Sequence, residues 1–98
     1  MRTRYNPLAR DEIIKAANYF EDQAEGLGVR FLSAIDRAVK EIANSPLAWP
    51  RTKYGTRKRI LVSPFPYTIH YKIQHHELVI IAIAHQSREP EYWKSRLE

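Results

Sequence analysis

The chain has no cysteine among its 98 residues. This absence excludes a disulfide framework, a thiolate nucleophile and a cysteine-based zinc site, and it fits a reducing cytoplasm. The chain also lacks an apolar run of membrane-spanning length, because its longest stretch, Leu78 to Ala84, has the length of a strand. The opening residues MRTRYNP contain no apolar signal core. We therefore expect a cytoplasmic protein with no membrane partner.

Glycine is scarce, with three residues, and none belongs to the glycine-rich loop that nucleotide hydrolases use to hold phosphates. Hydrophobic residues make up 44% of the chain and charged residues 28%, which is typical of a globular fold rather than a disordered chain. A chain of this length fits one domain with a modest core. We expect a single domain over residues 1–98.

The net charge of +5 is unevenly distributed along the chain. Residues 1–50 contain seven basic and seven acidic side chains, whereas residues 51–98 contain nine basic and four acidic ones. A positive surface on one side of the molecule would follow, and a nucleic acid, a ribosome or an acidic protein segment would suit it.

The first half has the pattern of two helices. Asn6 can cap a helix that begins at Pro7, and Asp11 and Glu12 place negative charge near the positive end of its dipole. Helical spacing then gives one apolar face, formed by Ile13, Ala16, Ala17, Phe20 and Ala24. Residues 26–28, Gly-Leu-Gly, predict a tight turn. A second helix follows with an apolar stripe formed by Phe31, Ile35, Ala38 and Ile42, with Val39 beside it, and it ends at residues 44–46.

The second half has the pattern of strands. Residues 58–62 predict one strand, and two prolines in residues 63–66 end it because proline cannot donate to a sheet. Residues 67–74 alternate apolar and polar side chains and predict a half-buried strand. Residues 75–76 predict a turn, residues 78–84 a central strand buried on both faces, and the residues before Asn6 an edge strand. We expect an α+β fold of order β-α-α-β-β-β, with a helical hairpin packed on one face of a largely antiparallel sheet.

Several segments resemble the RelE/ParE superfamily of toxins from type II toxin–antitoxin systems. They are the Gly-Leu-Gly turn, FLSAIDRAVKEIANSPLAWP, RKRILVSPFPYTIHYKI and IAIAHQSREPEYWKSR. The similarity covers Asn6 to Arg96. Its most specific parts are residues 65–67 (Phe-Pro-Tyr) and the set His85, Arg88, Pro90, Tyr92, Trp93 and Arg96. These details resemble the ParE branch more closely than the RelE branch.

The resemblance implies a growth-arresting toxin that a partner antitoxin holds inactive. RelE-like members cut messenger RNA in the ribosomal decoding site, whereas ParE-like members poison DNA gyrase and lack the nuclease residues. The antitoxin's C-terminal region wraps such toxins as a helix or strand with apolar anchors and acidic residues.

RNA cleavage without a metal needs a base, cations around the phosphate and an acid for the leaving oxygen. The candidate cations are Arg57, Arg59 and Arg88, and the candidate proton-transfer groups are His85 and Tyr92. His85 follows the predicted central strand, and histidine titrates near neutral pH. No catalytic residue is assigned firmly, since this set departs from the RelE pattern of several cooperating basic residues.

Structural roles compete with catalysis at each of these positions. His85 could be a hydrogen-bonded connector at a strand end, and Arg88 could form surface ion pairs with Glu89 and Glu91. Residues 92–93, Tyr-Trp, could anchor a C-terminal segment on the sheet. We therefore lean toward a protein that is not an enzyme; as an enzyme it would be a metal-independent endoribonuclease.

The basic stretch 51–59 contains five cations, one tyrosine and no acid. It could track a phosphate backbone, with Tyr54 stacking on a base, receive an acidic antitoxin segment, or be a solvated loop and strand edge. The candidate contacts for the target or antitoxin are Arg51, Lys53, Tyr54, Arg57, Lys58, Arg59, Trp93 and Arg96. The helical hairpin offers a groove for an amphipathic antitoxin helix, for which the flanking residues Leu8, Leu32 and Val39 are the candidates.

His70, His75 and His76 have no recognised metal-ligand spacing, so we expect neither a metal nor a cofactor. The leading hypothesis is a ParE-type toxin that binds an essential target, DNA gyrase, and is neutralised by a cognate antitoxin. The alternatives are a ribosome-dependent messenger-RNA endonuclease and a non-toxic nucleic-acid-binding or degenerate toxin module.

Overall fold

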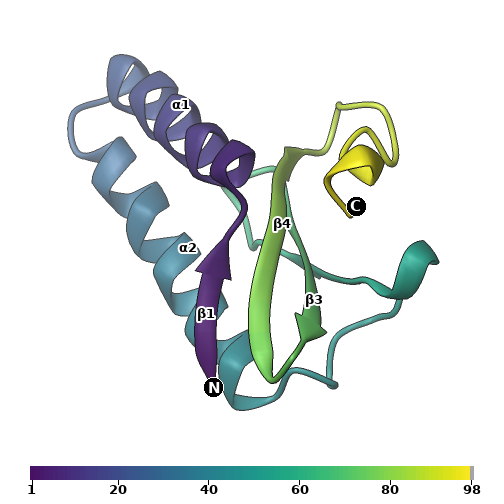
Figure 1. Ribbon diagram of the computed structural model, residues 1–98. Coiled ribbons are helices and arrows are strands. Elements are labelled where there is room, and N and C mark those ends of the chain that lie inside the picture. The colour runs from purple at the N-terminus through teal and green to yellow at the C-terminus, as the bar shows by residue number, and fades with distance from the viewer. Residues whose placement is uncertain (98) are drawn as a thin grey trace.

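A computed structural model describes residues 1–97 of the chain as a helical hairpin on one face of a four-stranded sheet (Figure 1). The elements follow the predicted order β-α-α-β-β-β. They are β1 (Arg2–Tyr5), α1 (Pro7–Gln23), α2 (Leu27–Asn44), β2 (Arg57–Ile60), β3 (Tyr67–Gln74) and β4 (Glu77–His85), with two short 3-10 turns, η1 (Lys53–Gly55) and η2 (Lys94–Leu97). The predicted α+β class and element order are confirmed.

Helix α1 begins where its capping residue predicts. The side-chain Oδ1 of Asn6 accepts a hydrogen bond of 2.8 Å from the backbone N–H of Leu8, and Pro7 occupies the first helical position. The expected role of Asp11 and Glu12 at the helix dipole is wrong, because the first turn contains no acidic residue. The Glu12 side chain instead lies toward the sheet, where it accepts a hydrogen bond from the backbone N–H of Ile83.

The two helices approach closely at the turn that joins them. Gly26 adopts a φ of 82°, a conformation that favours glycine. Gly28 lies where a Cβ atom would come within 2.6 Å of the carbonyl oxygen of Ala17. The carboxylate of Glu21 on α1 accepts from the N–H groups of both glycines, at 2.9 and 3.0 Å. It thus satisfies free donors at the start of α2, which has no capping side chain of its own.

The sheet has the order β1-β4-β3-β2, with one parallel pair, β1 and β4, and two antiparallel pairs. β1 is the predicted edge strand, and β4 is the predicted central strand. His75 and His76 form the turn between β3 and β4, each with a positive φ. β2 ends at Ile60 rather than Val62. The residue after Leu61 would pair with Pro66, and proline has no N–H to donate to the sheet.

The main core lies between the helices and the sheet. It is built from the predicted helix stripes, except for the exposed Ala24 beyond the end of α1, and from the helix-facing residues of β3 and β4, such as Ile69 and Ile83. Phe20 and Phe31 pack edge-on against Phe65, with ring centroids 5.1 and 5.4 Å apart. The Phe-Pro segment between β2 and β3 therefore closes one end of this core.

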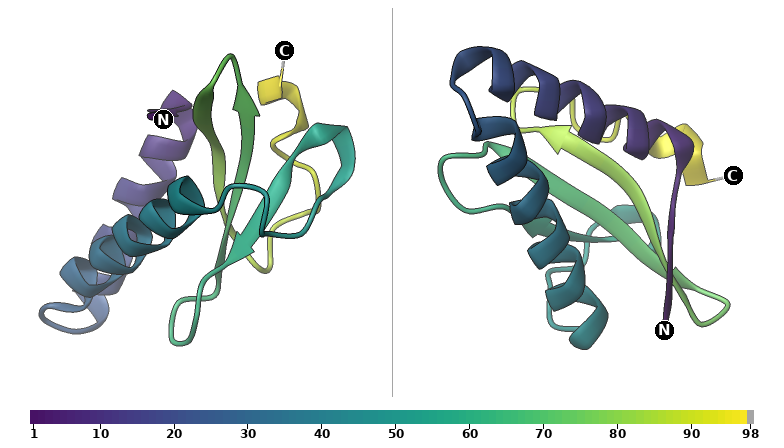
Figure 2. Two further views of the ribbon diagram at one scale, coloured as in Figure 1. Left: turned by 90° about the horizontal axis from the view of Figure 1, so that it is seen from below. Right: turned by 90° about the vertical axis from the view of Figure 1, so that its left-hand side faces the viewer.

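A third layer covers part of the opposite face of the sheet. Figure 2 shows the C-terminal segment on the side away from the helices. Trp93 packs there against Val79, Ile81 and Ala82, and Tyr92 and Leu97 border this small second core. Ile81 and Ala82 both belong to it because a β-bulge makes Ile81 an extra residue between the partners of Tyr71 and His70.

Neither helix in residues 1–97 is long and apolar enough to span a bilayer.

Candidate functional site

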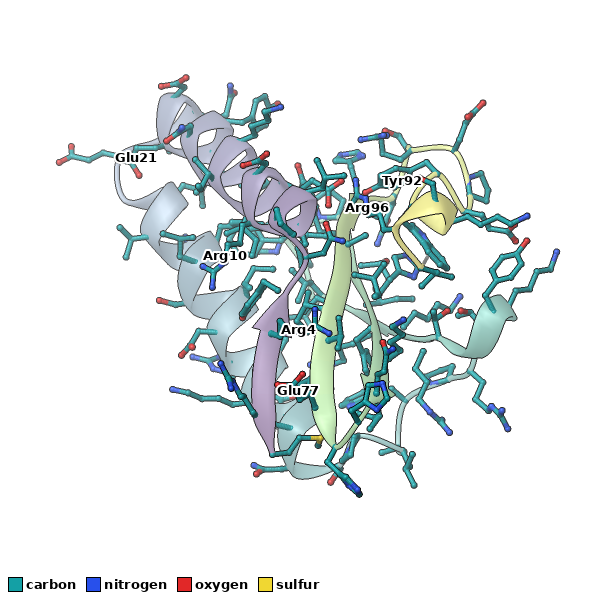
Figure 3. The ribbon with its side chains drawn as sticks, in the orientation of Figure 1. Arg4, Arg10, Glu21, Glu77, Tyr92 and Arg96 are labelled. Atoms are coloured by element: carbon teal, nitrogen blue, oxygen red, sulfur yellow. The ribbon has the colours of Figure 1, made fainter. Side chains whose placement is uncertain are left out.

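The C-terminal segment is held to the rest of the molecule through Glu12. Arg96 donates two hydrogen bonds to the Glu12 carboxylate, at 2.9 and 3.0 Å, and the hydroxyl of Tyr92 donates a third at 2.6 Å. Figure 3 shows Tyr92 and Arg96 side by side near the end of β4. The arginine and glutamate side chains are only 10% and 15% exposed, so this is a largely buried ion pair.

The electrostatics of this group favour its charged form. Burial alone would raise the pKa of Glu12, but the hydrogen bonds from Arg96, Tyr92 and the backbone of Ile83 outweigh it and lower that pKa. Burial and the neighbouring Glu12 carboxylate together raise the pKa of Tyr92. Tyr92 therefore remains a neutral hydrogen-bond donor at physiological pH, which is unsuited to the role of a base.

The same side chains complete the open edge of β4. β1 pairs with β4 only as far as Ile80. Beyond that point Glu12 accepts from the N–H of Ile83 at 3.0 Å, and Arg96 donates to the carbonyl of Ile81 at 3.1 Å. Two side chains thus replace the backbone partners that a longer β1 would have provided.

Two of the candidate catalytic cations have structural partners. Arg57 donates to the carbonyl oxygens of Trp49 and Leu47, at 2.7 and 3.1 Å. Arg59 forms an ion pair of 2.9 Å with Glu41 and stacks over the ring of Trp49. Both guanidinium groups therefore tie the loop after α2 and α2 itself to β2.

His85 and Arg88 line one hollow of about 370 Å³ together with Lys58. The Nδ1 atom of His85 lies 3.0 Å from the backbone N–H of Ser87, from which it accepts a hydrogen bond. Arg88 lies over the ring of Tyr92, at 3.8 Å from its centroid. The five catalytic candidates are therefore divided: His85, Arg88 and Tyr92 border this hollow, with the Tyr92 hydroxyl bound to Glu12, whereas Arg57 and Arg59 are engaged elsewhere.

The basic stretch does not present all its cations to one side. The register pairs Arg57 with Tyr71 and Arg59 with Ile69, and Tyr71 and Ile69 are buried under the helices. Lys58 pairs with His70 on the opposite face. Alternate residues of a strand point to opposite faces. Only Lys58 of these three is available on the face that carries the C-terminal segment.

The loop around η1 already contacts an acidic residue of the chain itself. Lys53 lies 3.4 Å from the carboxylate of Glu91, and the hydroxyl of Tyr54 donates to that carboxylate at 3.0 Å. The hydrogen bond from Tyr54 lowers the pKa of Glu91, with a contribution from Lys53. Glu91 thus occupies part of the surface that was expected to receive an acidic antitoxin segment. Arg51 is exposed.

One contact candidate, Trp93, is too buried to be reached in this structure. Trp93 is only 3% exposed and packs in the second core. It therefore anchors the C-terminal segment, as one interpretation expected, and is not available for contact with a partner. His70 lies against it, with ring centroids 4.7 Å apart. Burial, with a smaller effect of Lys58, lowers the pKa of His70 to about 4. His70 is therefore a neutral packing group, remote from the turn residues His75 and His76. In residues 1–97 no three His, Asp or Glu side chains are close enough to hold a metal.

The three groove candidates on the hairpin separate into two classes. Leu8 and Leu32 are 51% and 44% exposed, as expected. The expected exposure of Val39 is wrong: it is 7% exposed and belongs to the main core. At the spacing of a helix, Val39 follows Ile35 and Ala38 closely enough to share their face.

The sequence did not indicate the importance of Glu12. It is an ordinary polar position of an amphipathic helix, and its partner Arg96 lies 84 residues away. The one available signal was its position beside Ile13 on the face that turns to the sheet, where an unpartnered carboxylate would be costly.

A family model described as "ParE toxin of type II toxin-antitoxin system, parDE" matches residues 3–90. The chain belongs to the ParE toxin family. This confirms the predicted ParE branch, although the matched range ends before Tyr92, Trp93 and Arg96.

The ParE-type toxin also resembles solved structures in its fold. A chain of the chromosomal ParDE TA system from P. aeruginosa matches it with a TM-score of 0.62 and 16% sequence identity, covering 87% of this chain and 95% of that chain. At this identity the likeness shows a common fold. A search of curated proteins gave no match for this ParE-family chain.

Proposed function

We propose that this ParE-family toxin arrests growth in the cytoplasm by binding DNA gyrase, that it does not cleave RNA, and that a cognate antitoxin neutralises it. The observation that carries the proposal is the division of the nuclease candidates. Three of the five, Arg57, Arg59 and Tyr92, are bound to structural partners, and the remaining pair lacks the several cooperating cations that metal-free RNA cleavage needs.

The direct test is a supercoiling assay with purified toxin and DNA gyrase. We expect loss of supercoiling or accumulation of cleaved DNA as the toxin concentration rises. If gyrase is unaffected at saturating toxin, the proposed target is wrong.

Candidate contacts for the target are three cations that remain available at the surface, of which Arg51 and Arg88 are exposed and Lys58 is half-buried. Arg51 and Lys58 represent the basic stretch, and Arg88 borders the hollow with His85. Charge reversal at Arg51 should reduce gyrase inhibition and make it more sensitive to salt. Charge reversal at Lys15, an exposed residue of α1, is the matched control.

For the antitoxin, the outer surface of the hairpin supplies an apolar groove. Leu32 lies between two hollows, one of which it shares with Ile13 and Ile14. Ile14 is 58% exposed. Arg10 borders one hollow and Arg37 the other, and Asp36 borders both, so the exposed apolar side chains rather than net charge would bind the antitoxin helix.

Leu32→Asp should therefore weaken antitoxin binding by at least about tenfold, since an apolar anchor would become a desolvated charge. The affinity can be measured by calorimetry with purified antitoxin. The exposed residue Asn18 of α1, which lines neither hollow, is changed to Asp as the control for charge alone. An equal loss in both variants would contradict the groove.

One observation favours the endonuclease as a second candidate: His85 and Arg88 line the same hollow as Lys58. The endonuclease hypothesis predicts that His85→Ala or Arg88→Ala abolishes transcript cleavage in growing cells while the affinity for the antitoxin is unchanged. The degenerate-module alternative predicts harmless expression without antitoxin.

A further inference from the structure

A cationic hollow lies on the face of the sheet opposite the helices, between β1 and the turn η2. Its volume is about 250 Å³. Its floor is formed by Val79 and Ile81 of β4, with Leu97 at its side, and its polar lining consists of Arg4, Asn6, Lys72, Gln74 and Arg96. No carboxylate in residues 1–97 lines it. This hollow is separate from the one that holds His85.

The sheet register brings two of the cations together. Val79 pairs with Arg4 of β1 on one side and with Lys72 of β3 on the other. Residues in register point to the same face, and neighbouring strands lie about 4.8 Å apart. Two long cationic side chains therefore flank one apolar residue.

Among residues 1–97, the carboxylates around the hollow do not balance its cations. Glu77 is shared between Arg2 and Arg4, at 3.7 and 3.3 Å, and Glu12 pairs with Arg96. Figure 3 shows Arg4 and Glu77 along β1 and β4. Lys72 has no carboxylate within ion-pair distance in residues 1–97. In residues 1–97, the three cations that line the hollow have two carboxylate partners, one of them shared with the exposed Arg2, so positive charge is in excess.

Several donors around the hollow are held in position before any ligand arrives. Glu12 fixes the guanidinium of Arg96, whose Nε–H makes no hydrogen bond within residues 1–97. The helix cap uses the Oδ1 atom of Asn6, which leaves its side-chain NH₂ group to donate. A planar guanidinium with fixed geometry is well suited to phosphate oxygens.

We propose that this hollow binds a phosphate group, as inorganic phosphate or as the terminal phosphate of a monoester. The positive excess suits a phosphate monoester, which carries about −1.5 to −2 at pH 7. Donors reach the hollow from β1, β3 and η2, which suits a tetrahedral anion better than a planar carboxylate. The volume exceeds one phosphate, given about 30 Å³ for a water molecule, and leaves room for part of an attached group.

The test is a titration of purified toxin with inorganic phosphate, adenosine 5′-monophosphate and acetate at constant ionic strength, followed by amide chemical shifts. We expect saturable shifts confined to residues around Arg4, Lys72 and Val79 with either phosphate compound. Tighter binding of the nucleotide would identify a monoester, and equal binding would identify free phosphate. Equal or tighter binding of acetate would overturn the proposal.

Substitutions make the test specific to the hollow. Lys72→Gln and Arg4→Gln should each weaken phosphate binding about tenfold with an unchanged circular dichroism spectrum. Lys15→Gln and Arg30→Gln remove the same charges from exposed positions on the helices and should leave binding within about twofold. Equal weakening in the matched controls, or none in Lys72→Gln and Arg4→Gln, would show general attraction rather than a site and would overturn the proposal.

Discussion

Gly28 illustrates how a single residue sets the distance between two helices. An added Cβ atom would meet the backbone oxygen of Ala17 at 2.6 Å, and a backbone atom cannot move aside as a flexible side chain can. The carboxylate of Glu21 can bind the N–H groups at the start of α2 only because the helices are this close.

Gly28→Ala should lower the free energy of unfolding by about 1–3 kcal/mol, because α1 and α2 must separate. Urea denaturation measures this change. Ser33→Ala, on the exposed side of the same helix, should cause no loss. A Gly28→Ala variant as stable as the parent would contradict the close-contact argument.

His70 makes stability depend on pH through its burial against Trp93. Its folded-state pKa of about 4 lies below the ordinary value of 6.5, so the unfolded chain binds the proton more readily. The contribution of His70 is therefore complete above pH 6.5 and is lost progressively as the pH falls toward 4.

Between pH 7.5 and 5, this residue should account for a loss of at most roughly 2 kcal/mol of unfolding free energy. His70→Gln should remove that part of the pH dependence, and His75→Gln in the exposed turn should not. Unfolding by urea at the two pH values measures both. If the His70→Gln variant loses as much unfolding free energy between the two pH values as the parent does, His70 is not the cause of the pH dependence.

At the scale of elements, the C-terminal segment depends on one carboxylate of α1. Glu12 holds Tyr92 and Arg96 and also completes the edge of β4. Removing its charge would leave the Arg96 guanidinium buried without compensation.

Glu12→Gln should therefore destabilise the protein by about 2–4 kcal/mol, compared with less than about 0.5 kcal/mol for Asp36→Asn in the exposed pair with Lys40. The lowered pKa of Glu12 means that its contribution is complete above its unfolded pKa and is lost as the pH falls through the folded value. The parent should thus show an acid-dependent loss below about pH 4.3 that Glu12→Gln lacks. Similar acid profiles would argue against this role.

The elements themselves were predictable from local patterns. The Asn6 cap, a turn at Gly26 and the alternation in residues 67–74 act over a few residues, so they can be recognised in the sequence. The predicted turn is too long, because Leu27 and Gly28 already belong to α2. The site was harder to predict from the sequence, for two reasons. Arg57 and Arg59 fill helix-side positions of β2 that normally hold apolar residues, so the basic stretch does not reveal its faces. A second group, Glu12, Arg4 and Lys72, has neighbours that are distant in the sequence. Only the order of the strands and the reversals of the chain bring these side chains close to them.

At the scale of the whole molecule, the two cores differ greatly in size. The main core joins both helices to three strands, whereas the second core rests on Trp93 and its few neighbours on β4. The segment that covers the second core contains no strand or α-helix in residues 86–97. Its attachment is therefore weaker than that of the helices.

Native-state hydrogen exchange should show this difference. The amides of β3 and β4 that bond to backbone carbonyls within the sheet should exchange only through global unfolding. The amides of Lys94 and Arg96, which bond within the C-terminal turn, should open at lower free energy and low urea. Exchange of both groups at the same free energy would show that the three layers unfold as one unit.

The β-bulge at Ile81 has a consequence for comparing members of the family. Without Ile81, residues 79, 80, 82 and 83 would still alternate correctly between the two faces, so losing this residue would not reverse the strand. It would remove the carbonyl to which Arg96 donates. In an alignment of relatives, we expect chains with a one-residue gap at this position also to lack an arginine at position 96, so that the gap and the substitution are inherited together.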